Sequence, residues 1–254
     1  MAMRYGEWFY RKVAEDGRTH VGPIVAAILE YVQPRSVIDV GCGAGHFLAE
    51  FARRGIEDSL GVDFPGIAPE VLQIPRERFL GADLSKGLHF DRTFDLALSL
   101  EVAEHIAAES ADAFVDTLVD AAPITVFSAA IPRQGGYRHV NEQWPEYWAD
   151  KFAKRGFSVI DCLRDRLWND DAIPAYYRQN ILMFANESAL ARLPLSDAER
   201  RSQHRVLSRV HPSLYEERSD PARVGVRFLA SALARFPVTL VRSIGTQAKA
   251  RLVR

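Results

Sequence analysis

The sequence has little of what marks secreted, membrane-spanning or strongly charged proteins. Its two cysteines, Cys42 and Cys162, fit neither a disulfide framework nor a metal site. It has no run of about 18 apolar residues that could span a membrane, and Met1–Tyr10 lacks the apolar core of a signal peptide. The net charge of −1 gives the whole chain no electrostatic preference for nucleic acid. We therefore expect a cytoplasmic protein.

The composition is that of a folded globular protein, with 48% hydrophobic and 26% charged residues in 254. This length suffices for one large α/β domain with an appendage. Short apolar segments alternate with helical patterns, which predicts a doubly wound, mostly parallel seven-stranded sheet with a binding crevice at the carboxyl ends of its strands. The predicted strands are 37–40, 58–62, 78–81, 94–100, 124–129, 157–162 and 179–185, and the predicted helices include 20–32, 111–120 and 145–155.

A glycine-rich turn follows the first predicted strand. Gly41, Gly43 and Gly45 lead from this strand into a helical pattern, and such a turn lets a ligand approach the backbone. The spacing G-x-G-x-G departs from the dinucleotide fingerprint G-x-G-x-x-G, and the Lys-Ser/Thr pair of a phosphate loop is missing. Asp39 lies two residues before the first glycine, where it could meet a cation or a hydroxyl. The alternative is a tight turn without a ligand.

The segment D-x-G-x-G-x-G resembles motif I of the class I S-adenosylmethionine-dependent methyltransferases. The resemblance covers about residues 20–186 and implies a Rossmann-like methyltransferase fold with S-adenosylmethionine as cofactor. Asp63 ends the second predicted strand, where the ribose lies in such folds, and Asp83-Leu84 matches the position that contacts adenine. The cofactor-binding residues implied are Asp39, Gly41, Gly43, Gly45, Asp63, Asp83, Leu84 and Leu100. Taken singly, each acid is also compatible with a helix cap or a loop.

Glu101, Glu104 and His105 follow the fourth predicted strand at positions i, i+3 and i+4. A helix starting there would gather them on one face, as an oxygen-rich ligand set suited to Mg²⁺ or Mn²⁺. The segment resembles the E-x-x-E-H of small-RNA 2′-O-methyltransferases and of quinone O-methyltransferases, which implies a divalent ion held together with a later histidine, here His139. The alternative is a pair of solvated acids favoured by the helix dipole.

A metal bound by neighbouring hydroxyls would lower the pKa of these hydroxyls and orient one of them toward a methyl group. His139 is then either a ligand of the metal or the catalytic base. The spacing of the residues leaves both roles open.

The loop from Gly135 to Trp148 is rich in polar and flat aromatic side chains. Its candidate substrate residues are Tyr137, Asn141, Gln143 and Trp144. The stretch H-V-N-E-Q-W-P resembles one in bacterial methyltransferases of polysaccharide and glycolipid assembly, which also carry a Tyr-Arg-Gln-Asn segment, here Tyr177–Asn180. This resemblance implies a carbohydrate acceptor. The alternative is a helix start, with Asn141 as the cap and Trp144 in the core.

The two ends of the chain differ from the middle. We expect a methyltransferase domain over residues 1–186 and a basic helical C-terminal extension over residues 187–254. Basic side chains recur there every seven or eight residues, at Arg227, Arg235, Arg242 and Lys249. A basic amphipathic helix indicates peripheral contact with the inner membrane surface or with a partner; a cover on the sheet or a homodimer interface is equally compatible. The aromatic stretch Arg4–Thr19 is either a cap over the site or a packed helix.

The sequence thus predicts an O-methyltransferase that uses S-adenosylmethionine and acts on a sugar hydroxyl of a glycan, polysaccharide or glycolipid, aided by His139 and by Mg²⁺. One alternative acceptor is a quinone-type phenol, which would need a more apolar pocket. Another is RNA methylated at a 2′-hydroxyl, which only the basic tail supports. A cofactor-binding scaffold without turnover is the non-enzymatic alternative.

Overall fold

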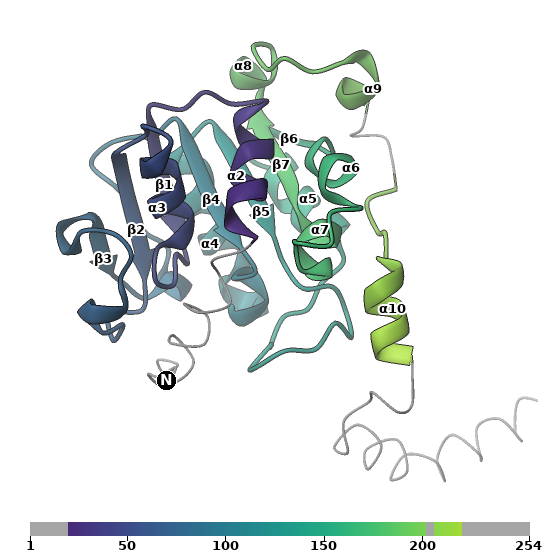
Figure 1. The fold of residues 1–254 in the computed structure, drawn as a ribbon, viewed down its shortest axis with the longest axis horizontal. Coiled ribbons are helices and arrows are strands. Elements are labelled where there is room, and N and C mark those ends of the chain that lie inside the picture. The colour runs from purple at the N-terminus through teal and green to yellow at the C-terminus, as the bar shows by residue number, and fades with distance from the viewer. Residues whose placement is uncertain (1–19, 202–205, 220–254) are drawn as a thin grey trace, which may run out of the picture. The chain divides into compact units, whose positions relative to one another are not determined.

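The computed structural model describes residues 20–201 and 206–219 (Figure 1). The chain divides into two compact units, residues 1–211 and 212–254. In the second unit the structure describes one helix, α10 (Pro212–Ser219). The predicted N-terminal cap and the basic residues from Arg227 to Lys249 lie outside the described residues. Within the described ranges, no helix is both long and apolar enough to cross a membrane.

A seven-stranded sheet with the order β3-β2-β1-β4-β5-β7-β6 forms the centre of the first unit. The strands are β1 (Ser36–Val40), β2 (Asp58–Asp63), β3 (Phe79–Gly81), β4 (Leu96–Leu100), β5 (Ile124–Ser128), β6 (Phe157–Ile160) and β7 (Leu182–Asn186). Only β7 runs against its neighbours, pairing antiparallel with β5 and β6. The predicted mostly parallel, doubly wound sheet is therefore confirmed.

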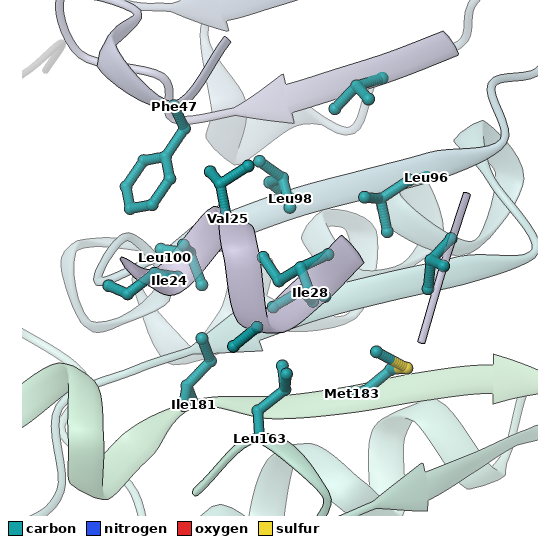
Figure 2. Close-up of a cluster of buried hydrophobic side chains, with 14 of the residues drawn as sticks. Ile24, Val25, Ile28, Phe47, Leu96, Leu98, Leu100, Leu163, Ile181 and Met183 are labelled. Atoms are coloured by element: carbon teal, nitrogen blue, oxygen red, sulfur yellow. The ribbon is translucent and has the colours of Figure 1, made fainter. Parts of the chain in front are cut away.

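Helices cover both faces of this sheet (Figure 1). One core cluster includes side chains of α2 (Val21–Leu29), α3 (His46–Arg53) and α6 (Leu163–Leu167), and the other includes side chains of α4 (Ala111–Ala121) and α5 (Pro145–Ala153). In the first cluster, Ile24, Val25 and Ile28 of α2 lie among Leu96 and Leu98 of β4 (Figure 2). Because both faces are covered, the strands are apolar on both sides, as in other parallel sheets.

The remaining elements are short. They are α7 (Ala175–Asn180), α8 (Glu187–Leu190), α9 (Asp197–Arg200) and the 3₁₀ helices η1 (Pro69–Val71), η2 (Arg76–Arg78), η3 (Leu84–Lys86), η4 (Ala103–His105) and η5 (Ala108–Ser110). The predicted last strand begins three residues late, at Leu182, because Gln179 belongs to α7. The polar run Tyr-Arg-Gln-Asn thus forms a helical turn ahead of β7.

The first unit extends to residue 211, beyond the boundary at residue 186 expected from the sequence. Leu193 and Leu195 are buried in the core cluster of α2, and Leu207 is buried in the cluster of α4. Apolar side chains and a buried hydrogen bond from Arg164 to the carbonyl of Leu207 (2.6 Å) hold this segment. The described residues of this segment, 187–201 and 206–211, therefore pack as part of the sheet unit.

A fully buried ion pair lies under this segment. Arg164 of α6 donates from Nε and Nη2 to both oxygens of Asp161, at 2.7 and 2.6 Å, and both side chains are 0% exposed. Such a pair stabilises little relative to apolar residues, but removing one partner leaves an unpaired buried charge.

We therefore predict that Asp161→Ala lowers the free energy of unfolding by about 3–5 kcal/mol, because it isolates the Arg164 guanidinium in the core. Urea unfolding would measure the change. Asp165→Ala is the matched control, since Asp165 lies four residues away, is half exposed and pairs with Arg209 at the surface; its loss should cost about 0–1 kcal/mol. Equal effects of the two substitutions would contradict the prediction.

Candidate active site

The glycine loop between β1 and α3 opens toward solvent at one residue. Gly41, Gly43 and Gly45 all have left-handed backbone angles, with φ of 92°, 54° and 86°, which glycine adopts without strain. A Cβ would lie 2.3 Å from Val102 at Gly41 and 2.9 Å from Ile74 at Gly45, but among the described residues it would meet nothing within 4 Å at Gly43. The loop therefore packs tightly at its ends and leaves its middle accessible to a ligand.

Two acids flank this loop at the ends of neighbouring strands. Asp39 of β1 is 3% exposed, and burial, with the nearby Asp63, raises its pKa to about 8. Asp63 ends β2 and accepts hydrogen bonds from the backbone of Gly43 (2.7 Å) and Phe64 (2.6 Å); burial raises its pKa as well. Buried carboxylates favour hydrogen-bond donors such as an ammonium group or hydroxyls.

The other predicted cofactor residues lie along the same edge of the sheet. Asp83 caps η3 by accepting from the backbone of Ser85 at 3.1 Å, and its bonds to Ser85 hold its pKa below the usual value. The capping role considered from the sequence is thus present. Leu84 is partly buried, and Leu100 is buried at the end of β4.

Glu104, His105 and His139 form a group that could hold a metal ion, since one ligand atom from each lies within 4.8 Å of the others. We call these residues the triad. Glu104 is 1% exposed, and its Oε2 has no hydrogen-bond partner among the described residues. Burial raises the pKa of Glu104 well above the usual value. A buried carboxylate oxygen facing two imidazoles is a reasonable fit for a divalent cation.

The two imidazoles of the triad are oriented by neighbouring oxygens. His139 Nδ1 lies 2.9 Å from Glu142 Oε1, which leaves Nε2 directed at Glu104 Oε1, 3.9 Å away. His105 Nδ1 lies 3.4 Å from the carbonyl of Arg138. Burial, and then the proximity of His139, lower the pKa of His105 to about 4, so this ring is neutral and able to bind a metal at neutral pH.

Glu142 was not predicted from the sequence, although its i+3 spacing from His139 is a signal. Its carboxylate also accepts the backbone N–H groups of Arg133 (2.8 Å) and Gly135 (2.7 Å). Arg133 and Arg138 have left-handed backbone angles, φ 72° and 59°, which are uncommon for residues other than glycine. Glu142 thus fixes the loop together with the histidine.

The predicted helix face carrying Glu101, Glu104 and His105 is wrong. Glu101 has a left-handed φ of 56° and precedes the single-turn η4, so it does not share a face with the other two. Its carboxylate lies outside the triad and accepts from Gln134 Nε2 (3.0 Å) and Asn180 Nδ2 (3.1 Å). The triad therefore offers one carboxylate and two imidazoles, and is less rich in oxygen than the sequence suggested.

The predicted substrate residues lie on the loop that carries His139. Tyr137 and Trp144 are 52% and 42% exposed, whereas Asn141 is buried. The backbone N–H of Asn141 donates to the carbonyl of Glu104 (3.0 Å), and its Oδ1 accepts from Gln143 (3.0 Å). Because Trp144 is exposed and is itself the uncapped start of α5, the alternative of a core tryptophan with an Asn141 cap is wrong.

Comparisons with known proteins agree with the fold. Residues 13–161, more than half of the chain, match the family model of the methyltransferase domain. The chain belongs to the methyltransferase domain family. An uncharacterized methyltransferase of Mycobacterium sp. (strain JLS) is 34% identical over 110 residues, which are 39% of this chain and 40% of the relative. The match thus spans less than half of the length of this curated relative.

Solved structures share the methyltransferase fold. The sugar N-methyltransferase KedS8 from Streptoalloteichus sp. ATCC 53650 superimposes with a TM-score of 0.54 and 14% identity, over 73% of this chain and 97% of that one. The methyltransferase domain of bacterial CtHen1-C gives a TM-score of 0.47 and 22% identity, over 68% and 98% of the two chains. At these identities the likeness concerns the fold alone.

The methyltransferase fold implies S-adenosylmethionine as cofactor, and the residues present fit it. The backbone is accessible at Gly43, and Asp39 and Asp63 on either side favour donors such as the amine and the ribose hydroxyls of that molecule. Asp39, Gly41, Gly43, Gly45, Asp63, Asp83, Leu84 and Leu100 are the residues that would hold it.

The buried Asp39 predicts a pH dependence of stability. Its pKa of about 8 in the folded protein exceeds the ordinary value of 3.8, so the folded state retains a proton that the unfolded state loses. Its contribution to stability therefore falls as the pH rises from about 4 to about 8. We predict that Asp39→Asn reduces the decline in stability across that range, measured by urea unfolding, while the raised pKa values of Asp63, Glu101 and Glu104 maintain the rest of it.

Asp83→Asn is the control for this measurement, because the pKa of Asp83 is shifted downward and its contribution changes only below about pH 4. The same decline with pH in the parent protein and in Asp39→Asn would show that Asp39 is not the titrating group.

The position of His139 depends on a glycine. A Cβ at Gly136 would lie 2.1 Å from His139 Nε2, and the bond to Glu142 prevents the ring from moving aside freely. We predict that Gly136→Ala lowers the affinity for Mn²⁺ at least tenfold, in calorimetry without cofactor. Gly22→Ala is the control, since its nearest contact would be an ordinary 3.7 Å; unchanged Mn²⁺ affinity in Gly136→Ala would refute the role of this ring.

Proposed function

We propose that this protein is an S-adenosylmethionine-dependent O-methyltransferase that methylates a sugar hydroxyl of a glycan, polysaccharide or glycolipid with the help of a divalent ion. The observation that carries the proposal is the triad: the carboxylate of Glu104 is buried and its Oε2 has no hydrogen-bond partner among the described residues, and one of its oxygens lies within 4.8 Å of a nitrogen of each oriented imidazole. Glu104 and His105 follow β4 and His139 lies on the loop after β5, and β1, a neighbour of β4, leads into the glycine loop. A metal-bound acceptor and a methyl donor would therefore meet at one edge of the sheet.

The ligands suggest which ion is held. Mg²⁺ prefers oxygen ligands in octahedral geometry, whereas imidazole nitrogen suits transition metals, and Mn²⁺ accepts carboxylate and water as well. With Glu101 engaged by two amides, the triad supplies two nitrogens and one carboxylate. This set favours Mn²⁺ over the Mg²⁺ expected from the sequence.

The loop next to the triad supports a carbohydrate acceptor. Asn141 Nδ2 is buried and has no partner among the described residues, so it can donate to an acceptor hydroxyl. Tyr137 and Trp144 present exposed rings, and flat rings cover the apolar faces of sugars. The likeness to the sugar N-methyltransferase extends to the fold alone, so the choice of a sugar rests on this loop and on the sequence resemblance.

The chemistry gives each group a role. A bound metal lowers the pKa of the hydroxyl that it coordinates. Glu142 keeps His139 in position, and the glycine loop, closely packed at Gly41 and Gly45, would hold the methyl donor near the acceptor. The acceptor oxygen bonds to the methyl carbon as the methyl–sulfur bond breaks, and the electron pair of that bond stays on sulfur, which becomes a neutral thioether.

The test is methyl transfer from labelled S-adenosylmethionine to a panel of cell-envelope glycans, with EDTA, Mg²⁺ or Mn²⁺ added. We expect methylated glycan, loss of transfer in EDTA and recovery that is stronger with Mn²⁺. Glu104→Gln and His139→Ala should retain cofactor binding and lose at least 100-fold in turnover. A quinol and a short RNA serve as competing acceptors.

Three outcomes would count against the proposal. Methyl transfer to the quinol or the RNA, but to no glycan, would show that the acceptor is not a carbohydrate. Turnover that EDTA does not change would show that no metal is needed and would leave His139 as a plain base. Full activity in both variants would show that the triad takes no part in the reaction.

A further inference from the structure

The carboxylate of Glu101 is held in one direction by two buried amides. Gln134 Nε2 donates to its Oε2 and Asn180 Nδ2 to its Oε1, and these two amide side chains are 7% and 3% exposed. Both carboxylate oxygens are thus engaged on one side by protein donors. The side chain of Ser128 also hydrogen-bonds to this carboxylate. Three protein donors therefore orient a group that has about four acceptor positions in all.

The direction of these amides is set by further hydrogen bonds. Asn180 Oδ1 accepts from Gln179 Nε2 (2.8 Å), whose own Oε1 accepts from the backbone of His211 (2.8 Å). Asn180 also donates to Gln134 Oε1 (2.9 Å). Each amide oxygen in this chain is used within it, so the N–H groups are the ends that face Glu101. Burial raises the pKa of Glu101 to about 7, and these donors stabilise its ionised form against that rise.

The backbone places Glu101 between the cofactor loop and the triad. Its N–H donates to the carbonyl of Ser128 at 3.0 Å, which holds its left-handed conformation, and such strain persists where the surroundings impose it. The next residue, Val102, packs against Gly41 of the glycine loop. Tyr177 of α7 is close enough to Asp39, Glu101 and Glu104 to be affected by the charge of all three.

The triad has no free atom for the proton of the acceptor. If His139 binds the metal through Nε2 and gives its Nδ1–H to Glu142, neither ring nitrogen has a lone pair left. The Nδ1 of His105 faces the Arg138 carbonyl, and the carboxylate of Glu104 would be engaged as a ligand of the ion. The base must then be a neighbouring group outside the triad.

We propose that Glu101 is a catalytic residue that takes the proton of the acceptor hydroxyl, and that Gln134 and Asn180 are positioning residues that direct its carboxylate. This inference rests on the proposed function. The acceptor oxygen bonds to the methyl carbon, its proton passes to the Glu101 carboxylate, and the sulfonium becomes a neutral thioether. One negative and one positive charge disappear together, so the step balances.

Asn180, Gln179 and His211 all lie beyond residue 161, where the match to the methyltransferase family model ends. Gln134 lies inside that match. Glu101 is therefore directed by one amide within the matched range and by one beyond it.

The test compares Glu101→Gln with Glu104→Gln in the full chain, with three readouts. We expect Glu101→Gln to bind Mn²⁺ and S-adenosylmethionine within about twofold of the parent protein by calorimetry, and to lose at least 100-fold in kcat on the responsive glycan. Glu104→Gln should lose Mn²⁺ affinity at least tenfold. A tenfold loss of Mn²⁺ affinity in Glu101→Gln would make Glu101 a ligand, and unchanged turnover would exclude it as the base.

The positioning role has its own measurement. Asn180→Ala should lower kcat about tenfold at nearly unchanged KM. The concentration of cofactor sites is first titrated by calorimetry, and kcat is calculated per site, so that unfolded protein is excluded from the comparison. Asn169→Ala, at an exposed asparagine of the same unit, is the control. If Asn180→Ala has fewer cofactor-binding sites but an unchanged kcat per site, Asn180 contributes to folding and does not position Glu101.

The outcomes separate this proposal from the function on which it rests. A parent protein that binds Mn²⁺ and cofactor yet methylates no glycan overturns the proposed function, and the proton transfer with it. An active parent whose Glu101→Gln variant is equally active overturns the role of Glu101 alone.

Discussion

The burial of carboxylates at one edge of the sheet is the constraint on which this site depends. Asp39 near the end of β1 and Glu104 in η4 are buried, and Glu101 directly after β4 is partly buried; burial raises the pKa of each. Removing a carboxylate from water is unfavourable unless a hydrogen-bond donor or a cation compensates for the lost hydration. The compensating groups differ among the three residues. Glu101 has two amides, Glu104 faces two imidazoles, and Asp39 lies beside the loop that the cofactor would occupy.

The three carboxylates therefore differ in whether they favour a ligand. The carboxylate whose donors come from the protein is satisfied without any ligand, whereas the other two favour a ligand. A cation near Glu104 and a donor-rich molecule near Asp39 would stabilise the folded protein as they bind. Binding and stability are then linked through the same buried groups, and the glycine loop supplies the close approach that both ligands need.

The fold and the cofactor side of the site could be predicted from the sequence because they depend on local patterns. Short apolar strands, the glycines after β1 and the acid that ends β2 are each contained in a few neighbouring residues. The conformation of Glu101 could not be predicted, since the i, i+3, i+4 spacing assumes a helix and its backbone is left-handed. Gln134 and Asn180 are 33 and 79 residues away in sequence, so no spacing rule connects them to Glu101.

The loop from Arg133 to Glu142 is closed on itself by a single carboxylate. Glu142 ties the backbone of Arg133 and Gly135, at the start of the loop, to His139 near its end. Between them, Gly136 and Arg138 lie against the two imidazoles, whereas the side chain of Tyr137 is exposed. If the loop contacts the acceptor as proposed, a change at Tyr137 can therefore alter acceptor preference without displacing the histidines.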